Sequence, residues 1–108
     1  MLEAARLIHG YMASVTAEQF WASSEKRDAV ALRISVIGGS AHKIDQTTEA
    51  ALPQIPFRNI RGMRHRIAHD YGAVDFAIVW EVTQTEIEPL ITRLEAYFKG
   101  RPAMQAPN

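Results

Sequence analysis

The chain contains no cysteine, which excludes disulfide bonds and metal sites built from thiolates. This absence favours an intracellular protein. The first residues, from Met1 to Arg6, form an amphipathic segment and lack the basic-then-apolar pattern of a signal peptide. We therefore expect a cytoplasmic protein.

Long apolar runs and net charge are missing as well. No stretch of the sequence approaches the roughly 18–20 apolar residues that a membrane-spanning helix needs. The formal net charge is zero, which argues against a protein that grips nucleic acid over its whole surface. What remains is a chain of 108 residues, 47% hydrophobic and 22% charged, with the length and composition of one globular domain.

Strand patterns are also absent, and apolar residues instead recur at helical spacing. Thr16 with Gln19 resembles a capping box, and Ser23 or Ser24 can cap the next helix. Gly72 is expected to stop the helix that precedes it. The expected helical segments are residues 2–14, a short one from Thr16 to Trp21, residues 24–44, residues 57–69, one capped by Asp75 that runs through Val82, and one from a Thr85–Glu88 capping box to Gly100.

Two prolines, Pro53 and Pro56, interrupt this pattern, so we expect a short turn at residues 48–52 and a connector at 53–56. The predicted fold class is all-α: an antiparallel bundle of four main helices plus one or two short ones. It forms a single helical domain over residues 1–100. The last residues, 101–108, lack periodicity and are expected to be disordered.

The longest expected helix carries two apolar rows. Its second row consists of Leu32, Val36 and Gly39, which predicts a helix buried on more than one side. Gly38 and Gly39 each cost roughly 1 kcal/mol relative to alanine in a helix. Such a pair is tolerable if the backbone of another helix approaches closely there.

The most distinctive segment is 58–71, RNIRGMRHRIAHDY, which holds four of the nine arginines and two of the four histidines. On a helical wheel, Ile60, Met63 and Ile67 form the side that must face the core. The opposite arc spans about 140°. In angular order it holds Arg64, Ala68, Arg61, His65 and His69. Phosphate-binding and proton-carrying side chains thus share one ridge.

This ridge suggests a chemistry. Arginine offers bidentate donors for phosphate oxygens, and histidine can take and give a proton near neutral pH. The segment has no serine or cysteine, so it does not suggest a protein nucleophile. The combination fits RNA cleavage without a metal, with the ribose 2′-hydroxyl as nucleophile.

Two plainer interpretations of the ridge stay open. A helix face rich in arginine and histidine is most often just a solvated surface. His65 and His69 could also be two zinc ligands, but no glutamate separates them as in H-E-x-x-H and no third ligand is evident. We predict neither a metal nor another cofactor.

Residues 64–71 read as R-x4-H-x-Y, with Arg64, His69 and Tyr71 at the fixed positions. This pattern resembles the signature of HEPN-domain ribonucleases, and in particular the HepT-like toxins of toxin–antitoxin pairs. The likeness covers about residues 2–98. In order along the chain it includes Asp28-Ala29-Val30, Ile37-Gly38, Ile55-Pro56-Phe57, Gly62-Met63-Arg64, Val74-Asp75 and Ile78-Val79-Trp80-Glu81.

The resemblance implies an all-helical homodimer in which the two R-x4-H segments meet at a composite cleft. Arg64 would orient the scissile phosphate of a tRNA or mRNA substrate, and His69 would serve as general acid and base. Three further basic side chains of the segment would support phosphate binding: His65, Arg61 and Arg66.

The resemblance also implies a regulatory partner. Tyr71 matches the tyrosine that a cognate minimal nucleotidyltransferase antitoxin modifies with AMP, which silences the toxin. A bulky anionic adduct two residues from His69 would block the cleft and compete for the arginines.

One position departs from the family pattern. The family commonly has an acidic residue after Ile37-Gly38, whereas this chain has Gly39. If that carboxylate orients the catalytic groups, the nuclease is weakened here. The alternatives are therefore a non-catalytic module that binds a nucleotide or a nucleotidyltransferase, and a pure dimerisation scaffold.

Overall fold

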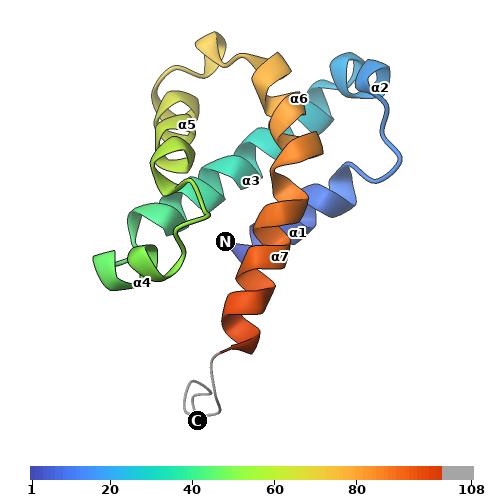
Figure 1. The fold of residues 1–108 in the computed structure, drawn as a ribbon. Coiled ribbons are helices and arrows are strands. Elements are labelled where there is room, and N and C mark those ends of the chain that lie inside the picture. The colour runs from blue at the N-terminus through green and yellow to red at the C-terminus, as the bar shows by residue number, and fades with distance from the viewer. Residues whose placement is uncertain (101–108) are drawn as a thin grey trace.

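A computed structural model describes residues 1–100 of the chain. The predicted disordered tail, 101–108, lies outside the described residues. Within them every regular element is a helix (Figure 1). The elements are α1 (Leu2–Tyr11), α2 (Ala17–Ala22), α3 (Ser24–His42), α4 (Gln46–Ala51), α5 (Phe57–His69), the 3-10 turn η1 (Tyr71–Ala73), α6 (Phe76–Thr85) and α7 (Ile87–Lys99).

The central element is α3, which contacts α1, α2, α5 and α6. Its most extensive contact is with α5, and α1 packs against both α3 and α7. Figure 1 shows α7 continuing α6 in nearly the same direction, while α5 stands apart from this pair. The all-α prediction is confirmed. If α6 and α7 are counted together, the fold of residues 1–100 has four main helices, and α2 and α4 are the short ones.

The core lies where the helices cross. Phe20, Ile8, Val30 and Val79 have the largest fully buried side chains, and they come from four different helices. Burial of such side chains stabilises each by about 1.5–3 kcal/mol relative to exposure. The core therefore fixes α3 against α1, α2 and α6, and α5 joins it through the buried side chain of Phe57.

Several helix starts predicted from the sequence are confirmed. The Thr16 side chain accepts a hydrogen bond from the Gln19 N–H, and the Gln19 side chain accepts one from the Thr16 N–H, which completes the capping box. The Ser23 hydroxyl caps α3 by accepting from the Lys26 N–H. The Asp75 carboxylate caps α6 by accepting from the Ala77 N–H. Each side chain satisfies a backbone donor that the first helical turn leaves free.

Other local predictions are wrong. The Thr85–Glu88 capping box does not form, because the Thr85 hydroxyl donates to the Glu81 carbonyl, and α7 begins at Ile87 without a side-chain cap. The turn expected at residues 48–52 is mostly helix α4, which Asp45 caps by accepting from the Thr48 N–H at 2.7 Å.

Two helices end differently from expectation. The first helix ends at Tyr11 rather than at residue 14, and Ser14 takes a positive φ of 61° in the following loop. Gly72 does not terminate α5 through a left-handed conformation: α5 ends at His69, and Gly72 lies in the 3-10 turn with a negative φ. Asp70 follows the last residue of α5, and its N–H donates the final helical hydrogen bond to the Arg66 carbonyl.

The second apolar row of α3 is not buried within the single chain. Leu32 is 58% exposed and Val36 is 41% exposed, so α3 is not covered on all the sides that the sequence predicted. Two large apolar side chains one helical turn apart form an exposed stripe.

Candidate active site

The basic segment forms α5 as expected, from Phe57 to His69. Pro56 precedes the first turn, where its missing N–H costs nothing. Phe57 is 2% exposed and anchors the start of the helix in the core. Ile60, Met63 and Ile67 pack against the core as partly buried residues. The predicted apolar side of the helix is therefore confirmed, and its orientation decides where each basic side chain lies.

Arg64 lies directly against the glycine pair of α3. A Cβ atom added to Gly38 would stand 2.2 Å from the Arg64 Cβ, and one added to Gly39 would stand 3.6 Å from its Nε. The close helix approach that would make a glycine tolerable is found at Gly38, since a side chain there would collide with α5. Within residues 1–100 the guanidinium of Arg64 has no hydrogen-bonding or ion-pair partner.

His65 and His69 lie side by side on the exposed crest of α5. Their ring centroids are 4.5 Å apart, at an angle of 48° between the ring planes. His69 follows Arg64 by five positions, which places it about 140° further round the helix. Arg64 therefore lies along α3 while the two histidines face solvent, and one chain does not bring the Arg64 and His69 side chains onto the same side of the helix.

The guanidinium of Arg61 is already engaged in hydrogen bonds to other helices. Its two terminal nitrogens donate to the two carboxylate oxygens of Glu49 at 3.1 and 3.2 Å, and one of them also donates to the Ala41 carbonyl at 3.2 Å. The guanidinium thereby ties α5 to α4 and to the end of α3. Its expected role in phosphate binding stays a prediction, and a phosphate would have to compete with Glu49.

Arg66 points to a different part of the surface. It lines a cavity of about 310 Å³ between α5 and α6, together with Arg58 and Asn59. Because Arg66 follows Arg64 by two positions, it lies about 200° round the helix from it. The basic helix therefore has two arginine-bearing sides, one toward α3 and one toward α6, with the histidines between them.

Tyr71 follows the helix in η1 and is fixed to α3. Its hydroxyl donates a hydrogen bond to the Asp28 carboxylate, and its ring packs edge-on against Phe76 with centroids 5.8 Å apart. Burial raises the pKa of Tyr71 to about 12, and the adjacent Asp28 carboxylate adds to this shift, since both disfavour the phenolate. The guanidinium of Arg27 acts in the opposite direction. The hydroxyl is consequently protonated at neutral pH.

Two contacts at this site were not assigned from the sequence. Asp28 belongs to the first turns of α3 and meets Tyr71 across 43 positions, and Glu49 meets Arg61 across 12. No local spacing rule pairs residues so far apart. For Asp28 the one available signal was its place in a segment that the resemblance already aligned, and for Glu49 the sequence carried no signal.

Two further observations concern the described residues as a whole. No group of three or more His, Cys, Asp or Glu side chains within residues 1–100 is placed to hold a metal ion. No helix in the same range has the length and apolar character needed to cross a membrane.

Comparison with known proteins assigns a family to this arrangement. The family model described as "Ribonuclease HepT-like" matches residues 1–97. The chain is similar to "Putative RNase MJ1216" of Methanocaldococcus jannaschii, with 33% identity over 82 residues that cover 76% of this chain and 68% of the relative. It is also similar to "Probable ribonuclease HepT" of Thermococcus cleftensis, with 27% identity over 93 residues, or 86% and 84% of the two chains. No solved structure was found to match.

Because the family model spans nearly the whole chain, the protein belongs to the HepT-like ribonuclease family. The resemblance inferred from the R-x4-H-x-Y segment is therefore confirmed. The roles of Arg64, His69 and Tyr71 stay predictions, since family membership alone does not test them.

Proposed function

We propose that this protein is the toxin of a toxin–antitoxin pair and cleaves RNA without a metal ion. The observation that carries the proposal is the arrangement on α5. Arg64 lies over Gly38 and Gly39, its guanidinium has no partner among residues 1–100, and two exposed histidines stand on the crest of the same helix. An anion-binding fork and proton-carrying groups are the two parts that such a reaction needs.

The reaction we propose is an internal transesterification. The ribose 2′-oxygen attacks the adjacent phosphorus while the bond from phosphorus to the 5′-oxygen breaks, which leaves a cyclic phosphate and a free 5′-hydroxyl. A neutral histidine accepts the proton of the 2′-hydroxyl, and a protonated histidine donates one to the leaving oxygen. Arg64 would stabilise the charge that develops on the phosphate oxygens.

We propose further that the site is shared between two subunits. Arg64 and His69 diverge by about 140° on one helix, so a second copy is a simple way to place an arginine opposite a histidine. The exposed stripe of Leu32 and Val36 supports this proposal. Asp28, Leu32, Val36 and Gly39 follow at helical spacing, so the stripe runs along α3 between the Tyr71 contact and the Arg64 contact. A two-fold axis through it would bring two α5 helices together.

The same geometry supports control through Tyr71 by a nucleotidyltransferase antitoxin. In the unmodified protein the Tyr71 hydroxyl donates to Asp28. Transfer of AMP from ATP to this oxygen forms a bond to the α-phosphorus and releases pyrophosphate and the phenolic proton, so the donor proton is gone and an anionic phosphate stands beside the carboxylate. Like-charge repulsion would then drive the adduct away from α3. The displaced nucleotide would occupy the space around the histidines and arginines.

Expression in cells and cleavage in vitro test the proposal. Wild-type protein should arrest growth and cut RNA in the presence of a chelator, whereas His69→Ala should do neither. Loss of a general acid–base group typically lowers the rate 10²–10⁴-fold. His9→Ala removes an exposed histidine from α1 and is the matched control, which should behave as wild type. Intact RNA and equal growth with wild type and His69→Ala would refute the proposal.

A second function is favoured by one observation. Gly39 leaves Arg64 without the carboxylate that commonly follows Ile37-Gly38 in the family, so the arginine could bind a nucleotide without orienting a reaction. The protein would then be a non-catalytic module for a nucleotide or a nucleotidyltransferase partner. A purified dimer that binds either of them but cuts no RNA with Tyr71 unmodified would support this function.

A further inference from the structure

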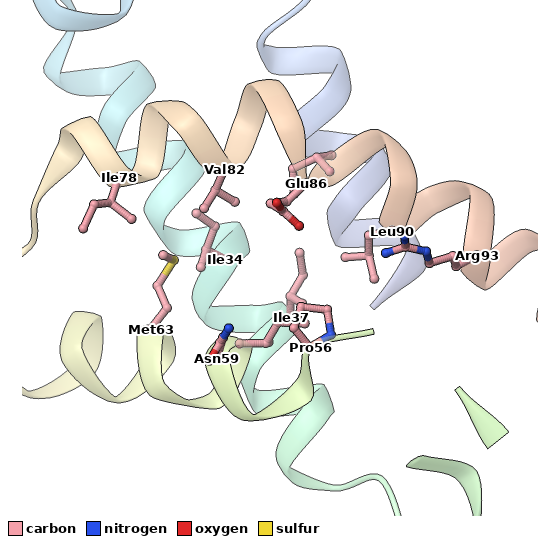
Figure 2. Close-up of a pocket in the computed structure, with 12 residues that line it drawn as sticks. Ile34, Ile37, Pro56, Asn59, Met63, Ile78, Val82, Glu86, Leu90 and Arg93 are labelled. Atoms are coloured by element: carbon pink, nitrogen blue, oxygen red, sulfur yellow. The ribbon is translucent and has the colours of Figure 1, made fainter. Parts of the chain in front are cut away.

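Helix α5 is covered by α3 on one side but barely touches α6 on the other. Between α5 and α6 lies the cavity of about 310 Å³, and a second one of about 410 Å³ adjoins it toward α7. The two cavities share Asn59, Met63 and Ile78 as lining residues. Figure 2 shows Met63 and Ile78 extending toward each other from facing helices across the larger one. Together they form a cleft, which we call the α5/α6 cleft.

The rim of the α5/α6 cleft is basic along the smaller cavity, whereas the larger cavity is lined by one carboxylate, Glu86, and one guanidinium, Arg93. Arg58, Gly62 and Arg66 stand four positions apart on one side of α5, so two arginines flank a glycine. Nothing lies within 4 Å of where a Gly62 side chain would begin, so the rim is open between them. Within residues 1–100 neither Arg58 nor Arg66 has an ion-pair or hydrogen-bonding partner. These are unsatisfied donors above a concave surface.

The floor of the cleft is apolar, with Met63, Ile67, Ile78 and Val79 among its lining residues. The one acidic side chain of the smaller cavity, Asp75, is engaged in capping α6 through the Ala77 N–H. A flat apolar group fits such a floor, and an anionic group fits the two guanidinium forks above it. A nucleotide of single-stranded RNA combines both, with its base against the apolar side chains and its phosphates at the arginines.

We propose that the α5/α6 cleft binds a nucleotide of the RNA strand beside the scissile position. This inference rests on the proposed ribonuclease function but concerns a different side of α5. Arg64 lies toward α3, Arg66 toward α6, and the crest with His65 and His69 lies between them. A strand whose scissile phosphate lies at the crest can continue over Gly62 into the cleft. The cleft thus assigns substrate positioning to Arg58 and Arg66.

Binding can be measured without cleavage by working in the His69→Ala protein with a short fluorescein-labelled single-stranded RNA of mixed sequence. Arg58→Gln and Arg66→Gln should each raise Kd about three- to tenfold and lower the salt slope by about one ion. Arg66→Lys keeps the charge but loses the fork, and should fall between wild type and Arg66→Gln. The control is Arg6→Gln on α1, whose surface ion pair with Glu95 lies on other helices; its Kd should stay within about twofold.

The outcomes separate this inference from the proposed function. RNA cleavage by wild type combined with unchanged Kd values for Arg58→Gln and Arg66→Gln would overturn the cleft as an RNA site alone. No cleavage by wild type combined with raised Kd values would leave the cleft standing and refute the nuclease. If a variant that combines Arg58→Gln with Arg66→Gln binds RNA normally but loses a nucleotidyltransferase partner, the cleft is a protein-docking surface and the inference is wrong. Thermal melting of each variant shows that its fold is intact.

Discussion

Tyr71 and Asp28 show how a single hydrogen bond can report on the state of a site. The hydroxyl donates to the carboxylate, and the pair joins the turn after α5 to the first turns of α3. Because the bond requires the phenolic proton, it is lost when the hydroxyl ionises or is esterified. The same contact therefore responds to pH and to covalent modification.

The ionisation of Tyr71 can be measured directly. In the wild type its pKa is about 12, whereas an unperturbed tyrosine titrates near 10. Asp28→Asn removes the negative charge beside the hydroxyl and should lower the pKa of Tyr71 toward the ordinary value, leaving the part due to burial. The readout is the tyrosinate absorbance of each protein minus that of the matching Tyr71→Phe variant. An unchanged pKa in Asp28→Asn would contradict the assigned contact.

The same shift has a consequence for stability. A pKa raised in the folded protein means that the protonated phenol is favoured there. The shift therefore adds to the free energy of unfolding. This added stability is fully present below about pH 10, where the tyrosine of the unfolded chain titrates, and is lost as the pH rises through about 12. Tyr71→Phe lacks a titrating group at this position and serves as the reference for its pH dependence.

At the scale of elements, the point where α3 and α5 cross determines the position of Arg64. The crossing point is Gly38, where a Cβ would stand 2.2 Å from the Arg64 Cβ and 2.9 Å from its Cγ. The near end of a side chain cannot swing aside, so α5 itself would have to move. The neighbouring Gly39 has only an ordinary contact at 3.6 Å.

The two glycines should therefore respond to alanine with opposite signs. Gly38→Ala should lower the free energy of unfolding by about 1–3 kcal/mol through overpacking, less the gain in helix propensity. Gly39→Ala should raise it by about 0.5–1 kcal/mol, because alanine favours the helix and meets no clash. Chemical denaturation of both variants measures the difference. Equal stabilisation by both substitutions would show that α5 does not approach α3 as described.

These elements also show what could be predicted from the sequence. The glycine pair indicated where another helix could approach closely. The caps at Thr16, Ser23 and Asp75 could be predicted because each cap depends on residues within three positions. The failed capping box at Thr85 depended on the same kind of signal. Its hydroxyl instead bonds back to the Glu81 carbonyl within α6, so the local pattern did not decide between two local partners.

Contacts between segments far apart in the chain could not be predicted from the sequence, for a different reason. The basic side chains of α5 were predicted to act together in phosphate binding, yet the positions of α3, α4 and α6 give them different surroundings. Arg61 pairs with Glu49, Arg64 lies on the glycines, and Arg66 faces the α5/α6 cleft. A helical wheel gives the angle between side chains, but only the positions of α3, α4 and α6 decide what each angle meets.

At the scale of the whole molecule, we expect a dimer that uses the exposed stripe of α3. Leu32→Glu and Val36→Glu would bury a charge in the interface and should shift the mass in solution from twice 12.1 kDa to the single chain. Sedimentation equilibrium or light scattering coupled to gel filtration measures this mass.

A control for this prediction lies on α7. Phe98 is 55% exposed, so Phe98→Glu changes an equally exposed apolar residue outside the proposed interface and should leave the mass unchanged. A wild type of 12.1 kDa at all concentrations, or an unchanged dimer in Leu32→Glu and Val36→Glu, would contradict the proposed interface.

The α5/α6 cleft has one more consequence for the molecule. Helix α5 is packed on one side only, so part of the apolar surface beneath it is left without a neighbouring side chain. A ligand that fills the cleft would supply this missing layer of the core. Occupancy and folding are then thermodynamically linked: saturating ligand raises the melting temperature, and a nucleotide held in the cleft would act, for the time it is bound, as a structural part of the protein.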